Sequence, residues 1–281
     1  MQIIVVDDNS DQDKVDFEHF PGLGDPFVEV IFTKEGKGAG YARNVGLTKA
    51  TGKWLLFADA DDFYNYCIND ILDEYVNSDS DIVYFKYNKM DSAMYTNIFN
   101  TNFYNSFIYY WKFLPKKFEC FLRYDVVVWS KLIKRELVNR YCILFDETYI
   151  SNDVTFSYLI GFYANSIYAD PRALYCYTIR KGSIRHNKLT LENYLDLIYV
   201  DGKRYRFFRK HNIPAYDKIA FIKFLIKLYF KDKTYFKKAK DILLHLKFTT
   251  IEIIKLYILY FLVYIPKRIK IKYLHRNIIH M

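Results

Sequence analysis

Two aspartates one residue apart, Asp59 and Asp61, directly follow an apolar run at 54–58. Carboxylates in a turn at the end of a strand can both face a hard divalent cation, which prefers oxygen ligands and bridges phosphate groups. The pair therefore predicts a metal-assisted phosphate site. The same spacing also fits an acidic loop in which Asp62 caps the following helix, and the sequence alone leaves both interpretations open.

A second acidic pair, Asp7 and Asp8, ends the apolar strand predicted over 3–6. A carboxylate at a strand end can accept hydrogen bonds from a ribose or a base bound in the adjacent crevice. The alternative is an Asx-turn or a helix N-cap, in which the same side chains hold only the local backbone.

A glycine-rich segment precedes the short sequence Ala-Arg-Asn at 42–44. A glycine such as Gly38 lets the backbone approach a ligand closely, and the guanidinium group of Arg43 matches the geometry of a phosphate. The segment does not match a P-loop, so it predicts phosphate contact without identifying the nucleotide.

A candidate general base lies further along the chain, where Ser-Asn-Asp at 151–153 opens a predicted helix. The helix dipole favours the ionised form of Asp153, and an ionised carboxylate in a cleft is what a general base requires. A plain N-cap is the alternative for the same residue. The basic loop at 180–186, with Arg180 and Ser183, can close over a diphosphate.

Predicted strands that alternate with predicted helices position these residues. Strands are expected over 3–6, 28–32, 54–58 and 82–87, and helices over 13–20, 40–50 and 69–76. Such alternation predicts an α/β fold with a mostly parallel sheet, whose ligands bind beyond the carboxyl ends of the strands. Further helices are expected over 190–211, 217–231, 233–247 and 250–265. We therefore predict a first domain at 1–188 and a basic, aromatic-rich helical subdomain at 189–281.

Charge is distributed unevenly, with a net charge of −7 over residues 1–180 and +16 over residues 181–281. A basic tail suits phosphate-rich partners, either anionic lipid headgroups or nucleic acid. The apolar run at 256–265 is too short to span a bilayer, and its basic flank at 266–272 predicts peripheral contact with an anionic membrane. A helical cap packed on the first domain is the alternative. Nucleic acid is not expected as a partner, because no recognised binding module accompanies the charge.

The cysteines and the N-terminus indicate the compartment. Four cysteines without a CxxC pair are predicted to be buried thiols in a reducing compartment. The first residues lack the basic region of a signal peptide. These features predict a cytoplasmic protein, and the basic tail predicts that it is held peripherally on the inner face of the cytoplasmic membrane.

In order and spacing, a series of segments resembles glycosyltransferase family 2, bacterial enzymes that invert the anomeric centre on a GT-A fold. The segments are Ile-Ile-Val-Val-Asp-Asp-Asn-Ser at 3–10, the glycine-to-Ala-Arg-Asn segment at 38–46, the DxD strand at 54–62, the acceptor-side segments at 128–132 and 151–153, and the basic loop at 177–183. The resemblance covers roughly residues 1–185. It implies a mostly parallel GT-A sheet with helices on both faces, followed by a C-terminal helical subdomain.

The resemblance also implies a role for each motif. Asp8 would contact the uracil ring, Asp59 the ribose or the metal, and Asp61 would ligate Mn²⁺ or Mg²⁺ beneath the diphosphate. Asp153 would deprotonate the acceptor hydroxyl. Further donor contacts are implied for Asp7, Gly38, Arg43, Asn44, Arg180 and Ser183. The reaction would move a hexosyl group from a nucleotide-sugar, typically a UDP-sugar, to a glycan or lipid-linked acceptor in surface polysaccharide synthesis.

Two features depart from the family pattern. Members usually begin with a further strand, turn and helix upstream of the position of Met1, and Asn152 stands where the family commonly has Glu. The first departure leaves open a non-catalytic or truncated remnant that acts as a binding protein. A receiver-type signalling domain, with Asp59 as phosphoacceptor, is a further alternative because 5–9 also resembles a receiver's first strand. The loop at 59–64 lacks the proline typical of receivers.

Overall fold

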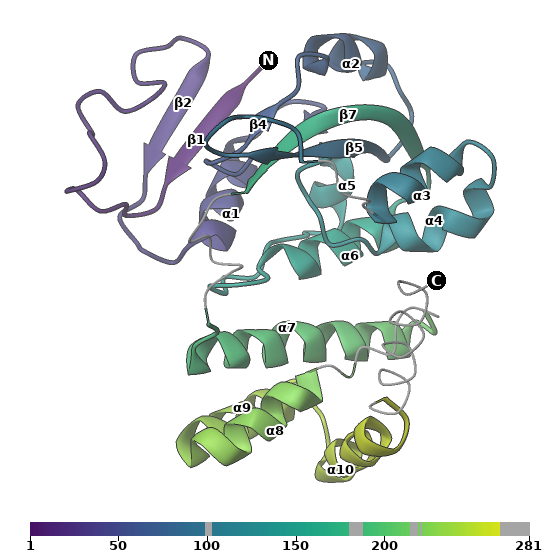
Figure 1. The fold of residues 1–281 in the computed structure, drawn as a ribbon. Coiled ribbons are helices and arrows are strands. Elements are labelled where there is room, and N and C mark those ends of the chain that lie inside the picture. The colour runs from purple at the N-terminus through teal and green to yellow at the C-terminus, as the bar shows by residue number, and fades with distance from the viewer. Residues whose placement is uncertain (99–102, 180–187, 214–218, 220, 265–281) are drawn as a thin grey trace. The chain divides into compact units, whose positions relative to one another are not determined.

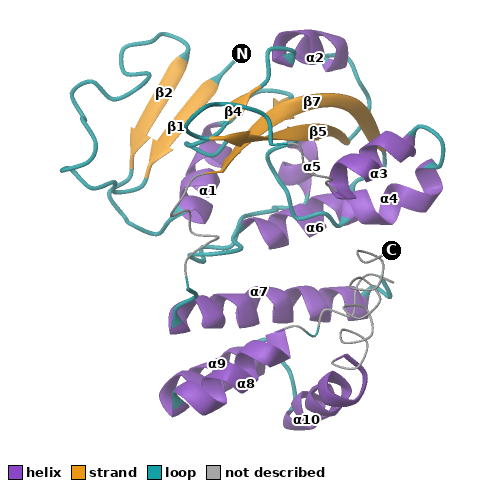
Figure 2. Cartoon of the chain, in the orientation of Figure 1, coloured by secondary structure: helices purple, strands orange, loops and turns teal. Residues whose placement is uncertain are grey.

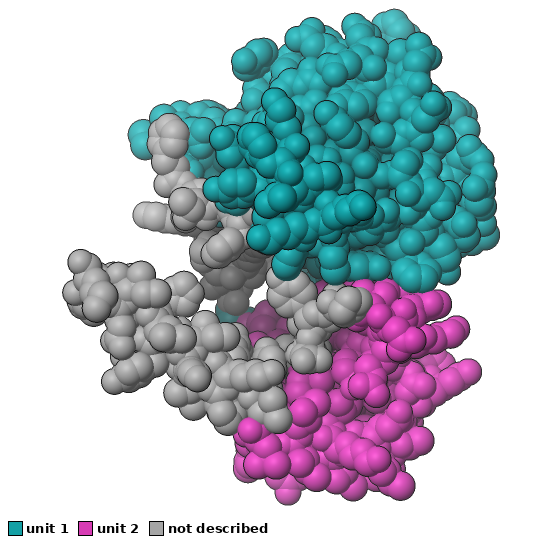
Figure 3. Space-filling model, turned by 90° about the vertical axis from the view of Figure 1, so that its right-hand side faces the viewer, with its two compact units in different colours: residues 1–188 teal, residues 189–281 magenta. Residues whose placement is uncertain are grey.

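The computed structural model describes residues 1–98, 103–179, 188–213, 219 and 221–264 (Figure 1). The chain divides into two compact units, Met1–Lys188 and Leu189–Met281, which are coloured separately in Figure 3. Each unit has a hydrophobic core of its own.

The described residues of unit 1 form two sheets, drawn as orange arrows in Figure 2. Two parallel strands, β1 (Ile3–Asp7) and β2 (Val28–Phe32), form the smaller sheet. The larger sheet has the strand order β3-β6-β5-β7-β4. Its strands are β3 (Trp54–Leu55), β4 (Phe63–Tyr64), β5 (Ile82–Asp91), β6 (Lys131–Lys134) and β7 (Ile167–Ile179).

The larger sheet is more mixed than the mostly parallel sheet expected from the sequence. β5 and β7 run parallel, as helical crossovers predict, but the pairs β3–β6, β5–β6 and β4–β7 are antiparallel. The reason is that β4 follows the acidic turn at 59–62 without a crossover helix and runs back along the edge of β7. β3 is also shorter than the strand expected over 54–58, because only Trp54 and Leu55 pair with β6.

The helix expected over 13–20 is absent from the structure, and turns occupy this segment. The Asp11 carboxylate accepts the Asp13 N–H, and the Asp16 carboxylate accepts the N–H groups of Glu18 and His19. Such local bonds offer the backbone an alternative to the helical pattern. The other two expected helices form as α1 (Ala39–Lys49) and α2 (Ile68–Tyr75).

Helices cover both faces of the larger sheet, as expected (Figure 1). Alternate residues of β5 point to opposite faces, because side chains alternate along a strand. Tyr84 lies in the core formed with α3 (Phe103–Trp111), α4 (Pro115–Arg123) and α6 (Asp153–Tyr163). Phe85 lies in a second core with α2. The short helix α5 (Arg135–Arg140) follows β6 and adds to the first core.

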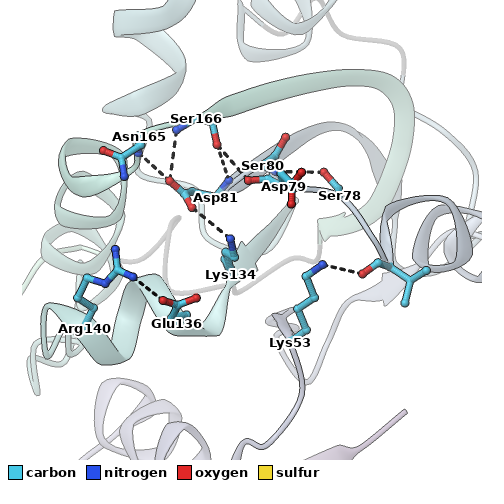
Figure 4. Close-up of polar contacts among 11 residues, drawn as sticks. Lys53, Ser78, Asp79, Ser80, Asp81, Lys134, Glu136, Arg140, Asn165 and Ser166 are labelled. Atoms are coloured by element: carbon cyan, nitrogen blue, oxygen red, sulfur yellow. Dashed lines mark hydrogen bonds and ion pairs between the residues drawn. The ribbon is translucent and has the colours of Figure 1, made fainter.

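A polar cluster around Asp81 fixes the amino ends of β5 and β7 (Figure 4). The Asp81 carboxylate accepts the N–H groups of Asn165 at 2.7 Å and Ser166 at 3.3 Å, and the Lys134 ammonium lies 3.8 Å away. The Asp81 N–H in turn donates to the Ser166 carbonyl. Because the register is held at this end, the carboxyl ends of the two parallel strands present fixed positions for functional side chains.

Unit 2 is helical, with α7 (Leu191–Lys210), α8 (Phe221–Lys231), α9 (Lys233–His245) and α10 (Thr250–Leu259), followed by a π-helical turn at Tyr260–Tyr264. Capping boxes at Thr190 and Thr249 begin α7 and α10, and the Asp232 carboxylate caps α9. The apolar face of α8, including Phe221 and Leu225, is buried in the core of this unit. That face is therefore occupied by packing between helices.

Among the helices of the described ranges, none is both long and apolar enough to cross a membrane. The basic segment predicted at 266–272 lies outside the described residues. The four cysteines are free, but only Cys176 is buried, so the expectation of four buried thiols is wrong. Cys142 is exposed because it follows the short helix α5 on the surface.

Candidate active site

The turn that carries the two aspartates is fastened to the carboxyl half of β7. The Asp59 N–H donates to the Tyr175 hydroxyl at 2.9 Å, and that hydroxyl donates to the Asp62 carboxylate at 3.0 Å. The Thr178 N–H donates to the other oxygen of Asp62 at 2.7 Å, and its hydroxyl donates to the Asp61 carbonyl at 2.6 Å. These bonds fix the turn, because every one of them joins it to a buried strand.

Asp62 is therefore an anchor to β7 and not a helix cap. The next helix, α2, begins after Cys67 as N-cap and has no side-chain cap hydrogen bond. Burial raises the pKa of Asp62, against the hydrogen bonds from Thr178 and Tyr175. The capping interpretation of the acidic turn is thus wrong, and its anchoring bonds come from sequence far away, in β7.

Arg43 connects this turn to the start of α6. Its guanidinium group donates to the Asp59 carboxylate at 2.5 Å and to the Asn152 side-chain oxygen at 2.7 Å. The Arg43 side chain is only 17% exposed, and it lies over the Phe145 ring at 5.4 Å. Because each terminal nitrogen of the guanidinium group donates a hydrogen bond, the group has little freedom to move. Asp59 and Asn152, which precedes Asp153, are therefore fixed relative to each other.

Asp153 is the first residue of α6, and Asn152 is the N-cap, without a side-chain cap bond. The plain N-cap interpretation of Asp153 therefore does not hold. Part of its surface is exposed, but it lies deep enough that burial raises the pKa of its carboxyl group. Arg43 and Lys131 oppose that rise, whereas the negative charge of Asp59 adds to it. The pKa of Asp153 thus lies above the ordinary value of an aspartate, which is the direction of shift that a general base requires.

Lys131, on β6, is a buried charge within the acceptor-side segment at 128–132, for which the sequence motif predicts no individual role. Its side chain is 0% exposed, its ammonium group donates to the Asp125 carbonyl at 3.0 Å, and it lies 5.1 Å from the Tyr84 ring centre. Burial lowers the pKa of Lys131 to about 8, against the charges of Asp125 and Asp153. The sequence signal for this buried charge was a lysine within the mostly apolar segment 126–133. Lysine is seldom fully buried without a partner, so such a position indicates a special role.

Asp8 binds the backbone of the glycine-rich loop that leads into α1. Its carboxylate accepts the Thr33 hydroxyl and the N–H groups of Gly36 at 3.0 Å and Gly38 at 2.6 Å. Burial acts to raise the pKa of Asp8, but these hydrogen bonds outweigh it and hold the pKa below its ordinary value. Gly38 has φ +89°, a conformation that favours glycine at the N-cap of α1.

Asp7 and Asn44 also hold the local backbone. The Asp7 carboxylate accepts the N–H of Ser10, three residues further on, at 3.2 Å, so this side chain holds the local backbone of the turn. The Asn44 amide exchanges two hydrogen bonds with the backbone of Phe145, at 3.1 and 2.9 Å. Close to it, a Cβ on Gly40 would lie 2.0 Å from the Asp146 carbonyl oxygen, so only glycine fits. These contacts seat α1 against 145–146 and thereby place Arg43.

The structure thus brings three predicted residues into one network. Arg43 bonds Asp59 and Asn152, and Asp153, the neighbour of Asn152, interacts electrostatically with Arg43 and Asp59. Asp7, Asp8 and Gly38 form a second group at the end of β1, and their contacts with a nucleotide remain predictions, as does that of Asn44. Arg180 and Ser183 lie outside the described residues. Within the described part of the chain, no three His, Cys, Asp or Glu side chains gather into a metal cluster.

Comparison with known proteins identifies the family. Residues 1–142 match the family model described as Glycosyl transferase family 2. The chain belongs to glycosyltransferase family 2. It is 27% identical over 223 residues to the glycosyltransferase GlyG of Streptococcus pneumoniae, a match that covers 73% of this chain and 69% of GlyG. A glycosyltransferase of Haemophilus influenzae is 34% identical over 77 residues, which cover 27% of this chain and 30% of that protein.

Solved structures share the fold of this family 2 chain. The S. aureus protein TarS, residues 1–349 in complex with UDP-GlcNAc, superposes with a TM-score of 0.50 at 22% identity. That match covers 70% of this chain and 55% of the TarS fragment. A longer TarS structure gives a TM-score of 0.51 at 19% identity, over 83% of this chain and 38% of TarS. The family 2 chain therefore has the GT-A fold and spans about half the length of the TarS fragment.

Proposed function

We propose that this family 2 glycosyltransferase moves a hexosyl group from a UDP-sugar to a hydroxyl group of a glycan or lipid-linked acceptor, with inversion at the anomeric carbon. One observation carries the proposal. The Arg43 guanidinium joins Asp59, on the donor-side turn, to Asn152, the neighbour of the candidate base Asp153. A carboxylate suited to a metal-diphosphate and a carboxylate suited to proton removal are thus held in one network.

The acidic turn fits a divalent cation bound together with a diphosphate. Asp61 is exposed and Asp59 partly exposed, and Mg²⁺ and Mn²⁺ favour carboxylate oxygens. Two protein carboxylates are few for a closed protein cage, but they suffice where substrate phosphates supply further oxygens. When bound, the cation would neutralise charge that develops on the departing nucleoside diphosphate. Asp61 and Asp59 would hold it, and Arg43 would keep Asp59 in place.

Asp153 would take the proton of the acceptor hydroxyl as that oxygen attacks the anomeric carbon. One in-line displacement, with the leaving nucleotide on the opposite side, inverts the configuration. Arg43 and Lys131 favour the ionised form that accepts the proton, against the burial that disfavours it. Asn152 keeps a hydrogen-bond acceptor for Arg43 where family members commonly have Glu.

The proposal includes a peripheral position on the inner face of the cytoplasmic membrane. Five large apolar side chains on α10 and the π-helical turn are more than half exposed, and they are Ile251, Ile254, Ile258, Phe261 and Leu262. An apolar helical face in a unit rich in lysine suits an interfacial contact with anionic lipid. Such a contact would bring the chain close to a lipid-linked acceptor in surface polysaccharide synthesis.

A second candidate is a non-catalytic remnant that binds a nucleotide or glycan. The observation that favours it is the separation of the β1–β2 pair from the larger sheet within the described strands. Moreover, the Asp8 carboxylate already accepts hydrogen bonds from the backbone of the glycine-rich loop. Turnover separates the two candidates, because a remnant would bind without releasing product.

A donor screen tests the proposed activity. The purified chain is incubated with a panel of UDP-sugars, Mn²⁺ and short alkyl glycoside acceptors, and the UDP released is measured by a coupled assay. We expect one donor to give Mn²⁺-dependent UDP release that acceptor accelerates and that Asp61→Ala abolishes. UDP binding without release from any donor would support the remnant instead.

A further inference from the structure

The α3–α4 hairpin presents exposed aromatic side chains next to lysines. We name residues 109–117, the end of α3, the connecting turn and the start of α4, the hairpin tip. Its sequence is Tyr-Tyr-Trp-Lys-Phe-Leu-Pro-Lys-Lys. Four large apolar side chains of the tip are exposed by about half or more, and they are Tyr109, Tyr110, Phe113 and Leu114. Phe113 is the most exposed of them, at 64%.

The hairpin itself is firmly packed, so the exposure of its tip does not reflect a loose helix pair. Ile108, Trp111 and Leu122 are buried in the core of unit 1. Phe107 of α3 stacks on Phe121 of α4 at 4.8 Å between ring centres. The two helices lie side by side next to the sheet (Figure 1). The exposed side chains are therefore held in place on a rigid support.

The tip is positively charged. Lys112, Lys116 and Lys117 are exposed, and residues 109–117 contain no acidic side chain. None of the three lysines forms an ion pair with a described residue. The nearest acid along the chain, Glu119, is paired with Arg123. The positive charge of the tip is thus not neutralised locally.

We propose that the hairpin tip is an anchor that inserts its aromatic side chains into the headgroup region of an anionic membrane. Tyrosine and phenylalanine rings favour the boundary between water and hydrocarbon, and lysine stems can lie along apolar surface with the ammonium group among lipid phosphates. A second copy of the chain is a poorer occupant, because a twofold contact would place the three lysines against their own copies.

The proposal goes beyond the donor chemistry of the proposed function, since it concerns how unit 1 itself meets a lipid surface. It assigns a membrane contact to unit 1 in addition to the one proposed for α10 in unit 2. Neither the tip nor its lysines take part in the network of Arg43, Asp59 and Asp153. Vesicle binding and UDP binding therefore fail independently of each other.

Vesicle binding of the full chain tests the anchor. We expect the chain to sediment with vesicles of phosphatidylcholine and phosphatidylglycerol in equal parts, and much less with phosphatidylcholine alone. Replacing Lys112, Lys116 and Lys117 together with glutamine should lower the partition coefficient on the order of 100-fold, since each surface lysine contributes to binding. The matched control replaces Lys14, Lys49 and Lys53, which change the net charge equally and lie elsewhere in unit 1.

A Phe113→Trp variant then locates the contact. Its additional fluorescence should shift to shorter wavelength on vesicle binding and be quenched by lipids brominated in the acyl chain. The proposal is overturned if the wild-type chain does not bind anionic vesicles. It is also overturned if the triple control variant lowers vesicle binding as much as the triple variant of the tip. Binding that survives the tip triple but is lost in Ile254→Ser with Ile258→Ser assigns the contact to α10 alone and also overturns it. Loss of a dimer in the tip triple, without vesicle binding, shows a contact between copies instead.

Discussion

Replacing Asp153 with asparagine is expected to lower kcat of sugar transfer by on the order of 10²–10⁴, because the acceptor hydroxyl then loses its proton acceptor. Asparagine keeps the size of the side chain and its place at the start of α6. UDP binding should change little, since the donor contacts are proposed for other residues. The measurement is kcat and KM with the best donor found, together with calorimetric titration of UDP.

The control for this variant is Asp70→Asn, which alters an exposed carboxylate in the first turn of α2. It should leave kcat unchanged. Burial raises the pKa of Asp153, so its ionised form is disfavoured in the folded chain, and a neutral side chain there should not lower the free energy of unfolding. Transfer at the wild-type rate by Asp153→Asn would exclude this residue as the base.

The same shift in pKa sets the direction of the pH dependence. A base acts in its deprotonated form, so the rate falls as acid protonates it. The pKa of Asp153 lies above its ordinary value. The acid limb of the pH profile of kcat, where the rate falls as the base is protonated, should therefore lie at higher pH than for an exposed aspartate.

Replacing Lys131 with methionine is expected to stabilise unit 1 and to impair catalysis. Burial lowers the pKa of Lys131 to about 8, which corresponds to on the order of 3 kcal/mol against the charged form. A neutral side chain of similar length avoids that cost at neutral pH. It also removes a positive charge that favours ionised Asp153, so the pKa of Asp153 should rise and the acid limb should move to higher pH.

The sign of the stability effect can be checked against pH. Between pH about 8 and its ordinary value near 10.5, Lys131 is protonated in the unfolded chain but not in the folded one, so wild-type stability rises with pH. The advantage of Lys131→Met should therefore be largest below pH about 8 and shrink above it. All three tryptophans lie in unit 1, so their fluorescence during urea unfolding reports this unit.

A combined variant distinguishes an effect through Asp153 from a purely structural one. If Lys131 acts on the base, Lys131→Met should cost much less activity when Asp153 is already asparagine. Additive losses, or an acid limb that does not move, would show that Lys131 only supports the packing around Tyr84 and Asp125.

The sequence was sufficient to predict the motifs and the elements that bear them. The apolar runs before Asp8 and Asp59 and the glycines before Arg43 predicted β1, β3 and the start of α1. Local pattern determines such features, because an apolar run that ends in a polar turn has few other places in an α/β fold.

Long-range contacts could not be predicted in this way. The anchoring of the acidic turn depends on Tyr175 and Thr178, more than 110 residues away along the chain. The bond from Arg43 to Asn152 likewise joins residues 109 apart in sequence. The antiparallel pairing of β4 with β7 and the burial of Lys131 also depend on the assembled sheet. The prediction of a helix over 13–20 was wrong for a local reason, because the side chains of Asp11 and Asp16 accept hydrogen bonds from the backbone there.

The proposed metal-dependent donor site is tested most directly by calorimetric titration of UDP into the purified chain, with and without Mn²⁺, repeated with Asp61→Ala. We expect binding that requires Mn²⁺ in the wild type and is lost in the variant, because Asp61 would hold the cation beneath the diphosphate. Circular dichroism should show that both proteins are folded. UDP binding that is indifferent to Mn²⁺ and to Asp61→Ala, or no binding by a folded wild-type chain, would contradict a metal-dependent donor site on this turn.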